Sequence, residues 1–273
     1  MAERNDEQLS RLLKQFIDRT GEVSQGIDAL VADQAIPKRI AESLACDLNF
    51  LPQRYARNQG TLGCEGQRQL LRTKVLVAGL GGLGGYVLEQ LCRCGIGVVV
   101  GVDADHFDET NLNRQLLADL NSIGISKTEV ARRRVTEIND AVEFYPFACK
   151  VEDLTGRDYE DVALIFDCLD LIPSKLHLQD MGERLQIPLI HGAIGGWYGQ
   201  VAVVWPASQL LTTIYGARTE GIERELGNPP FTPAFVASLM VSEGIKVLLQ
   251  KNRKEDSMLF VDLLTNQLER VNF

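Results

Sequence analysis

The central part of the chain alternates between short apolar runs and segments with helical periodicity. Residues 74–78, 97–102 and 161–167 are nearly continuous apolar runs, which is typical of strands buried on both faces of a sheet. Residues 127–139 and 175–185 instead carry apolar side chains at spacings of three and four, which predicts helices. Strands that alternate with helices pair in parallel. The order therefore predicts an α/β fold with a Rossmann-like, doubly wound and mostly parallel sheet.

The two ends of the chain follow other patterns. Apolar residues near the start recur at helical spacing, which predicts a small helical N-terminal cap over residues 1–52 and a main domain over residues 53–273. Near the other end, residues 258–263 and 268–271 flank a short turn, which predicts antiparallel C-terminal strands. Residues 207–232 have no clear periodicity, and we expect a long loop there.

The charge of the chain changes which partners are expected. The formal net charge is −9 and the sequence pI is about 5.0. Binding to nucleic acid or to an anionic membrane depends on neutralising phosphates with basic side chains. An acidic chain therefore makes nucleic acid an unlikely main partner, and the same argument disfavours an anionic membrane surface.

The cysteines and the apolar runs indicate a compartment. None of the six cysteines stands in a Cys-x-x-Cys pair, so the sequence predicts no zinc site. The first ten residues are polar and lack the apolar core of a signal peptide. No run reaches the ~18 apolar residues that span a bilayer. We expect a cytoplasmic protein with reduced thiols.

A glycine-rich turn follows the first of the buried strands. Gly79, Gly81 and Gly84 satisfy the pattern Gly-x-Gly-x-x-Gly, with Gly82 inside it, between a predicted strand and a predicted helix. Glycines there allow a sharp turn and let phosphate oxygens approach the N-terminus of the helix. Asp103 ends the next strand, where an acid can bind ribose hydroxyls. The motif predicts nucleotide binding but leaves the kind of nucleotide open.

Polar residues further along the chain narrow the chemistry. Arg114, Lys127 and Asp170 all lie close after predicted strands or in the loops that follow them, at the carboxyl side of the sheet. Hydride transfer has no need for two cations and a metal-binding acid beside phosphates. Attack of a carboxylate on the α-phosphate of ATP does, because negative charge grows on the transferring oxygens and on the leaving pyrophosphate. Taken singly, each residue could also be a surface charge or a turn residue.

Several short motifs follow one another between about residues 54 and 271. Besides the glycine loop they are Arg54-Tyr55-x-Arg57-Asn58, Asp103-x-Asp105, Asn111-Leu112-Asn113-Arg114-Gln115, Ile123-Gly124-x-Ser126-Lys127, Asp167-x-x-Asp170 and Gly199-Gln200-Val201. With these motifs the chain resembles the ThiF/MoeB/HesA family, the bacterial relatives of ubiquitin-activating enzymes. The combination of the glycine loop with Asn-Arg-Gln and Ser-Lys is highly specific.

The resemblance implies a nucleotide site with ATP and Mg²⁺ as cofactors. Asp103 would bind the ribose of the adenosine, and Asp170 would coordinate the magnesium ion. The residues that would contact the phosphates are Asn111, Arg114 and Lys127. Three further residues of the matching stretches are assigned to the same nucleotide site: Asp105, Asn113 and Gln115.

The resemblance also implies partners. Arg57 looks like the family's arginine finger, which reaches into the site of the other subunit, so a homodimer with Arg57 acting in trans is expected. The acceptor would be the C-terminal Gly-Gly carboxylate of a small ubiquitin-like sulfur-carrier protein of the ThiS/MoaD type. The enzyme would release pyrophosphate and leave an acyl-adenylate that later receives sulfur, destined for thiamine, molybdopterin, an amino acid or a peptide product.

The chain departs from the family at three places. Leu171 follows Asp170, where the family often has asparagine. The zinc-binding cysteine pairs of many members are absent. No cysteine follows Cys168, so residues 207–232 cannot supply a thiol. We therefore expect adenylation without a crossover-loop cysteine intermediate.

Three alternatives remain open at this point. The carboxylate could belong to a tRNA base, as in the cyclising dehydratases among the relatives that lack zinc cysteines. The glycine motif would also suit a nicotinamide- or flavin-binding oxidoreductase. A noncatalytic scaffold would need none of the charged residues.

The segment of residues 191–197 also has two interpretations. It either lines a channel for the carrier tail or forms a tight loop under Trp197.

Overall fold

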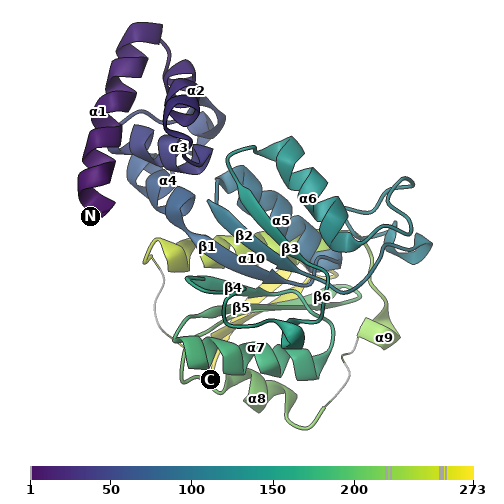
Figure 1. Cartoon of the computed structure of the whole chain (residues 1–273). Helices are drawn as coiled ribbons and strands as arrows, with labels where there is room; N and C mark the ends of the chain where they lie inside the picture. The colour runs from purple at the N-terminus through teal and green to yellow at the C-terminus, as the bar shows by residue number, and fades with distance from the viewer. Residues whose placement is uncertain (1, 219–220, 222, 252–254, 256) are drawn as a thin grey trace. The chain divides into compact units, whose positions relative to one another are not determined.

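The computed structural model describes residues 2–218, 221, 223–251, 255 and 257–273, and within them eight strands form one sheet (Figure 1). The strands are β1 (Lys74–Ala78), β2 (Val98–Val102), β3 (Glu143–Phe147), β4 (Leu164–Asp167), β5 (Leu189–Gly195), β6 (Tyr198–Val204), β7 (Ser257–Asp262) and β8 (Gln267–Asn272). Their order across the sheet is β3-β2-β1-β4-β5-β6-β7-β8. The pairs β1–β4 and β4–β5 are parallel, and β5 to β8 pair antiparallel. The predicted α/β fold with antiparallel C-terminal strands is confirmed.

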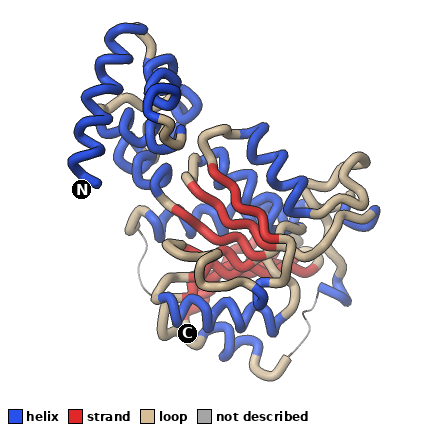
Figure 2. The backbone as a smooth tube through the Cα atoms, viewed as in Figure 1, coloured by secondary structure: helices blue, strands red, loops and turns tan. Residues whose placement is uncertain are grey.

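Among the described residues, α1 to α4 precede the first strand, and the other helices lie in connections between strands (Figure 2). The α-helices are α1 (Ala2–Thr20), α2 (Val23–Gln34), α3 (Lys38–Asp47), α4 (Gly63–Arg72), α5 (Gly82–Cys94), α6 (Lys127–Ile138), α7 (Ile172–Leu185), α8 (Leu210–Tyr215), α9 (Glu223–Leu226) and α10 (Phe231–Leu248). Short 3-10 turns are η1 (Gln53–Asn58), η2 (Glu109–Asn111) and η3 (Val151–Asp153).

Contacts within the chain define two compact units. The first unit has a core of its own, in which Leu13, Leu30 and Leu44 from α1, α2 and α3 are fully buried. These helices agree with the helical N-terminal segment expected from the sequence, while the domain boundary at residue 52 stays a prediction. The first unit consists of residues up to 73, 92–98 and 136–143, and the second of residues 74–91, 99–135 and 144–273.

In the second unit, helices cover both faces of the sheet. Ile165 of β4 and Leu189 of β5 belong to the same buried cluster as Leu178 of α7 and Leu211 of α8, so α7 and α8 pack on one face (Figure 1). Helix α10 packs against β4, β5 and β6 on the other face. It lies close to the sheet because β5 carries Gly192 there, where a Cβ atom would overlap with the side chain of α10.

Helix α10 is also the one described helix long and apolar enough to cross a membrane by composition. Half of its residues are buried inside the structure, among them Val236 and Met240, and it contacts three strands. This packing is that of a core helix in a doubly wound fold.

Two expectations about irregular structure are wrong. The predicted loop at residues 207–232 contains α8 and α9, which are too short for a periodicity to stand out. Positions 219, 220 and 222 of that loop lie outside the described residues. Of the two alternatives for residues 191–197, the tight loop is wrong over residues 191–195, because β5 continues through Gly195 and only Gly196 and Trp197 form the turn to β6.

The two edge strands of the sheet carry residues that oppose further pairing. Strand β3 includes Pro146, which has no N–H to donate to another strand. Strand β8 has Glu269 and Arg270 near its middle, and both side chains are exposed. Proline and charged residues on edge strands hinder edge-to-edge association.

Candidate active site

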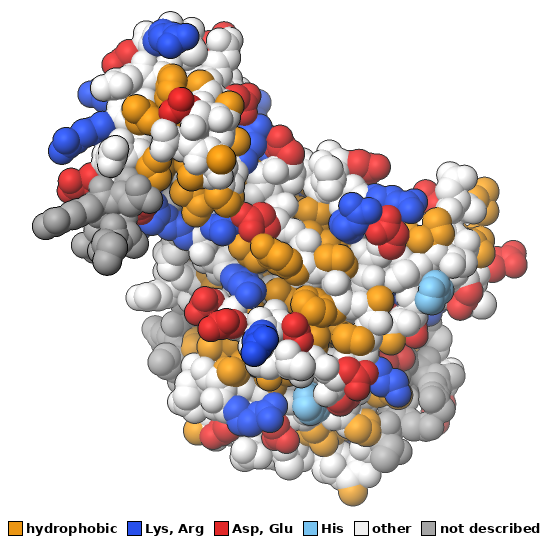
Figure 3. Space-filling model, in the orientation of Figure 1, with side chains coloured by type: hydrophobic (Ala, Val, Ile, Leu, Met, Phe, Trp, Pro, Cys, Tyr) orange, Lys and Arg blue, Asp and Glu red, His pale blue; other side chains and the backbone are white. Residues whose placement is uncertain are grey.

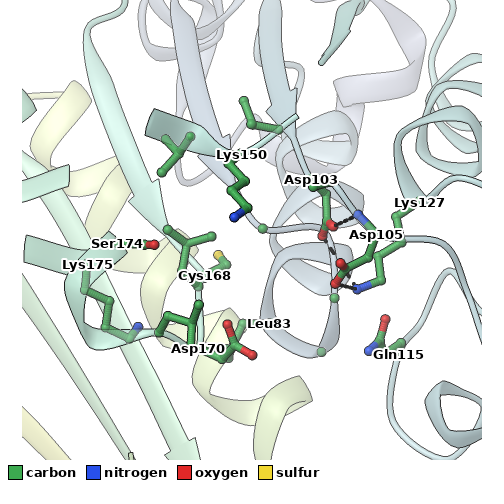
Figure 4. Close-up of a pocket in the computed structure, with 18 of the residues that line it drawn as sticks. Leu83, Asp103, Asp105, Gln115, Lys127, Lys150, Cys168, Asp170, Ser174 and Lys175 are labelled. Carbon is green, nitrogen blue, oxygen red and sulfur yellow. Dashed lines mark hydrogen bonds and ion pairs between the residues drawn. The ribbon is translucent and has the colours of Figure 1, made fainter. Parts of the chain in front are cut away.

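A cavity of about 660 Å³ opens in the second unit at the carboxyl ends of β1, β2 and β4 (Figure 4). This is the edge of an open α/β sheet at which ligands bind. Figure 4 shows Asp103, Asp105 and Lys127 on one side of the cavity and Asp170 and Lys175 on the other. The fold therefore brings most of the predicted site residues together at this cavity.

The glycine loop forms the floor between β1 and α5. Gly79 has φ +87, and a Cβ atom there would lie 2.7 Å from the carbonyl oxygen of Cys168. A Cβ atom at Gly84 would overlap with the carbonyl oxygen of Gly79. Gly81 and Gly82 instead line the cavity, and a Cβ atom at Gly81 would only reach ordinary contact, 3.5 Å from the amide of Gln115. Two glycines thus shape the turn, and the other two leave room for a ligand at the start of α5.

Asp103 is held at the end of β2 by the backbone around it. Its carboxylate accepts hydrogen bonds from the N–H of Leu80 at 2.7 Å and from the N–H of Asp105 at 2.9 Å. Burial raises the pKa of Asp103, although the nearby Lys127 opposes the shift. Lys127 Nζ lies 2.9 Å from Asp105 and 3.8 Å from Asp103. The lysine is therefore already inside the cavity with a carboxylate as its partner.

Two amide oxygens on the cavity wall lack partners. Gln115 Oε1 and Asn228 Oδ1 are buried, and no donor within the described part of the chain reaches either atom. A buried acceptor without a donor costs free energy, so such atoms indicate a missing partner. Ribose hydroxyls or peptide N–H groups could donate to them, whereas phosphate oxygens could not.

The residues of the Asn-Leu-Asn-Arg-Gln stretch, 111–115, differ in their contacts, and only some of them line the cavity. Arg114 lines the cavity and donates from Nη1 to the carbonyl oxygen of Thr110 at 2.7 Å and to Asn113 Oδ1 at 2.9 Å. Asn113 in turn donates to the backbone carbonyl of Asn228 at 3.0 Å. Asn111 is buried outside the cavity lining, where it forms a capping box with Asp108. Its contact with phosphates stays a prediction.

Arg57 is not among the residues that line the cavity. It is exposed at the end of η1 in the first unit. The predicted role in the site of a second subunit would need an exposed arginine, and this role stays a prediction.

Asp170 offers an exposed carboxylate to the cavity. No group of three or more His, Cys, Asp and Glu residues suited to a metal ion occurs among the described residues. Magnesium does not need such a cage, because it binds through one or two carboxylates together with substrate phosphates and water. The donor set at Asp170 therefore fits a magnesium ion that arrives with a nucleotide.

A buried polar cluster lies behind Asp170, and the sequence did not reveal it. Lys175 Nζ of α7 lies 3.3 Å from both carboxylate oxygens of Asp167 and donates to the carbonyl oxygen of Gly192 at 3.0 Å. His191 Nδ1 lies 2.7 Å from Asp167 Oδ2. Asp167 and His191 are completely buried, and Lys175 is 3% exposed. No local motif joins these residues, because three separate elements contribute them.

Burial and charge act in opposite senses in this cluster. Burial alone would raise the pKa of Asp167, but Lys175 and His191 outweigh it and the pKa is lowered. Burial lowers the pKa of His191 and the charge of Lys175 adds to this, while the hydrogen bond to Asp167 and its charge oppose the shift without cancelling it. The cluster therefore holds an ionised carboxylate on Asp167 and a neutral imidazole on His191.

The fold and the cavity define a nucleotide-binding α/β enzyme. Residues 55–273 match the ThiF family, and the chain belongs to this family. Membership confirms the family and the adenylyltransferase class that the motifs indicated.

Individual relatives support the same class. The chain is 30% identical over 236 residues to a SAMP-activating enzyme E1 of Haloferax volcanii, covering 81% of this chain and 84% of the relative. It is 34% identical over 207 residues to a sulfur carrier protein adenylyltransferase of Thermus thermophilus, covering 69% and 73%. A tRNA threonylcarbamoyladenosine dehydratase of Bacillus subtilis is 35% identical over 138 residues, covering 50% and 54%.

A solved structure shares the fold. The crystal structure of E. coli MccB with ATP superposes with a TM-score of 0.64 at 20% identity, covering 90% of this chain and 82% of that chain. At this identity the match shows the architecture alone.

Proposed function

We propose that the protein transfers the adenylyl group of ATP to the C-terminal Gly-Gly carboxylate of a small ubiquitin-like sulfur-carrier protein. One observation carries the proposal: a single cavity holds the glycine loop, the cations Arg114 and Lys127, and the carboxylate of Asp170 on the opposite wall. The names of two relatives, a SAMP-activating enzyme and a sulfur carrier protein adenylyltransferase, support a carrier as the acceptor.

The cavity suits this displacement. The carboxylate of the carrier attacks the α-phosphorus, a new O–P bond forms, and the bond to the β-phosphate oxygen breaks to release pyrophosphate. No general base is needed, because a C-terminal carboxylate is ionised near neutral pH. Lys127 and Arg114 stabilise the charge that grows on the phosphoryl oxygens. Magnesium bound at Asp170 would offset the charge of the leaving pyrophosphate.

The cavity also offers space and partners for a peptide tail. Ala193 and Ile194 of β5 line it beside Asn228, whose Oδ1 lacks a donor. A backbone N–H of an extended Gly-Gly tail would satisfy this oxygen.

The acyl-adenylate would leave without a covalent link to the enzyme. Cys149 and Cys168 line the cavity, but burial raises the pKa of both thiols, so the thiolate needed for attack is disfavoured. We further propose that the enzyme works in the cytoplasm as a homodimer, with Arg57 of one subunit serving the site of the other.

The proposal is tested by ATP–pyrophosphate exchange with magnesium and a panel of Gly-Gly-ended carriers. Exchange should require one carrier, and Lys127→Ala and Asp170→Ala should reduce it by about a hundredfold or more. Lys14→Ala, an exposed lysine of α1, is the matched control and should exchange normally. A wild-type enzyme that binds ATP but shows no exchange with any carrier would contradict the proposal. So would an enzyme adduct that reducing agents release.

A second acceptor deserves the same assay. The relationship to a tRNA-modifying dehydratase makes a carboxylate on a tRNA base the alternative acceptor. The net charge of −9 disfavours it, and on the face shown in Figure 3 basic and acidic side chains are interspersed. Exchange that depends on tRNA and not on a carrier would establish this alternative instead.

A further inference from the structure

Tyr215 is the last residue of helix α8. Its hydroxyl group belongs to a series of hydrogen bonds that reaches Asp167, just before the loop that carries Asp170. The hydroxyl group of Tyr215 lies 3.0 Å from His191 Nε2, and Gln200 Nε2 donates to that hydroxyl at 2.8 Å. On the other side of the imidazole, Nδ1 faces Asp167. These side chains come from α8, β6, β5 and β4, so the contacts link four elements across one face of the sheet.

The partners fix the direction of each hydrogen bond. Asp167 is ionised and can only accept, so His191 donates from Nδ1–H. The neutral imidazole then accepts at Nε2. Tyr215 donates a hydrogen bond there at 3.0 Å while it accepts from Gln200, whose Nε2 also lies 3.3 Å from the same imidazole nitrogen. The chain of donors runs from Gln200 through Tyr215 and His191 to Asp167.

Asp167 passes this order on to the cavity. While Oδ2 accepts from His191, Oδ1 accepts from the backbone N–H of Leu169 at 3.1 Å. This second bond shapes the loop Cys168-Leu169-Asp170, all three residues of which line the cavity. Rotation of the Asp167 carboxylate would therefore change how Asp170 is presented.

We propose that Tyr215 and His191 are positioning residues that orient the Asp167 carboxylate, and through it the loop that presents Asp170 to the metal ion of the nucleotide. This inference rests on the proposed function, because it takes Asp170 as the magnesium ligand. It assigns a task to α8, a helix that provides none of the residues lining the cavity.

The test separates metal binding from folding. Tyr215→Phe removes the hydroxyl and keeps the ring. Tyr159→Phe is the matched control, since Tyr159 packs against the same core cluster outside the hydrogen-bond chain. The dissociation constant of α,β-methylene-ATP is measured by calorimetry for the full chain, with magnesium and with EDTA. Thermal unfolding is measured alongside.

We expect magnesium to strengthen binding to the wild type and to the control equally. In Tyr215→Phe the affinity in EDTA stays the same, while the gain from magnesium falls about three- to tenfold, the loss of one neutral hydrogen bond. An unchanged gain would overturn the inference. A wild type that binds no nucleotide would instead refute the proposed function.

A pair of His191 variants keeps the question answerable if Tyr215→Phe folds poorly. The amide N–H of His191→Asn stands near the place of Nδ1–H and can still donate to Asp167, whereas that of His191→Gln stands near Nε2. We expect the asparagine variant to keep more of the magnesium gain than the glutamine variant. Equal gains in the two variants, or the reverse order, would overturn the positioning role.

Discussion

Lys127 and Lys175 lie on opposite sides of the cavity, and their ion pairs have different surroundings. Lys127 is itself 7% exposed, but it pairs with Asp105, whose side chain is 72% exposed. Lys175 pairs with Asp167, which is fully buried, and is itself 3% exposed. An ion pair open to water is weak and easily exchanged, whereas separating a buried pair leaves an uncompensated charge. Lys127 can therefore leave its carboxylate for a phosphate, and Lys175 keeps its partner.

This difference suggests a division of labour within one site. We expect the wall with Lys127 to change its ion pairs when a nucleotide enters, and the wall with Lys175 to hold its geometry. A preorganised group costs no reorganisation during the reaction. Mutations on the two walls should accordingly separate effects on ligand binding from effects on folding.

The largest expected effect is on the buried wall. Lys175→Met leaves the carboxylate of Asp167 without its cation, so the free energy of unfolding should fall by about 3–5 kcal/mol. Asp105→Asn removes only the water-exposed carboxylate beside Lys127, so it should change the free energy of unfolding by less than about 1 kcal/mol. Urea unfolding of both variants measures the contrast. Equal losses would show that the two walls do not differ in the proposed way.

An intermediate effect is expected at the glycine loop. A Cβ atom at Gly81 meets only the side chain of Gln115 at ordinary contact distance, so Gly81→Ala should fold normally. It should weaken ATP binding by about 1–3 kcal/mol, because the methyl group enters the space left for the ligand. Gly84→Ala, whose Cβ would overlap with the backbone of Gly79, should lose stability as well. Calorimetric ATP binding and thermal unfolding distinguish the two; normal ATP binding by Gly81→Ala would place the phosphates elsewhere.

The smallest effect is a dependence of stability on pH. The folded-state pKa of His191 is lowered from its ordinary value of 6.5, so below that pH the unfolded chain binds a proton that the folded chain does not. Stability that is present above pH 6.5 is then lost on acidification, by at most about 1.4 kcal/mol per pH unit for one proton. Denaturant unfolding from pH 7.5 to pH 5 should show a shallower decline for His191→Asn. Parallel declines would mean that His191 is protonated in the folded protein.

The sequence predicted the local parts of the molecule and missed the parts assembled over long distances. The glycine loop, Asp103 and Lys127 were found because each lies at the end of a predicted strand or the start of a predicted helix. Neighbouring residues in the sequence are enough to place them. The contact of Asp167 with Lys175 and His191 depends on which strands become neighbours, and periodicity does not state this. A buried strand that ends in Asp167 was the available signal, because a buried carboxylate requires partners.

The helices α8 and α9 escaped prediction for a related reason. Six and four residues make too few turns for helical periodicity to be recognised. Helix α8 is stabilised instead by tertiary contacts, such as the hydrogen bond from the N–H of Leu211 to Gln179 Oε1 of α7 at 2.9 Å. Short elements of this kind depend on their neighbours rather than on their own sequence.

The residues on the edge strands of the sheet limit how two copies of the chain could form a dimer. With Pro146 in β3 and the charged pair Glu269 and Arg270 in β8, neither edge favours a continuous sixteen-stranded sheet across a dimer. The predicted homodimer would therefore be joined by side chains of helices, loops or a sheet face. Its formation would then depend on surface complementarity, and a single substitution on such a surface could separate the subunits while the fold of each stays intact.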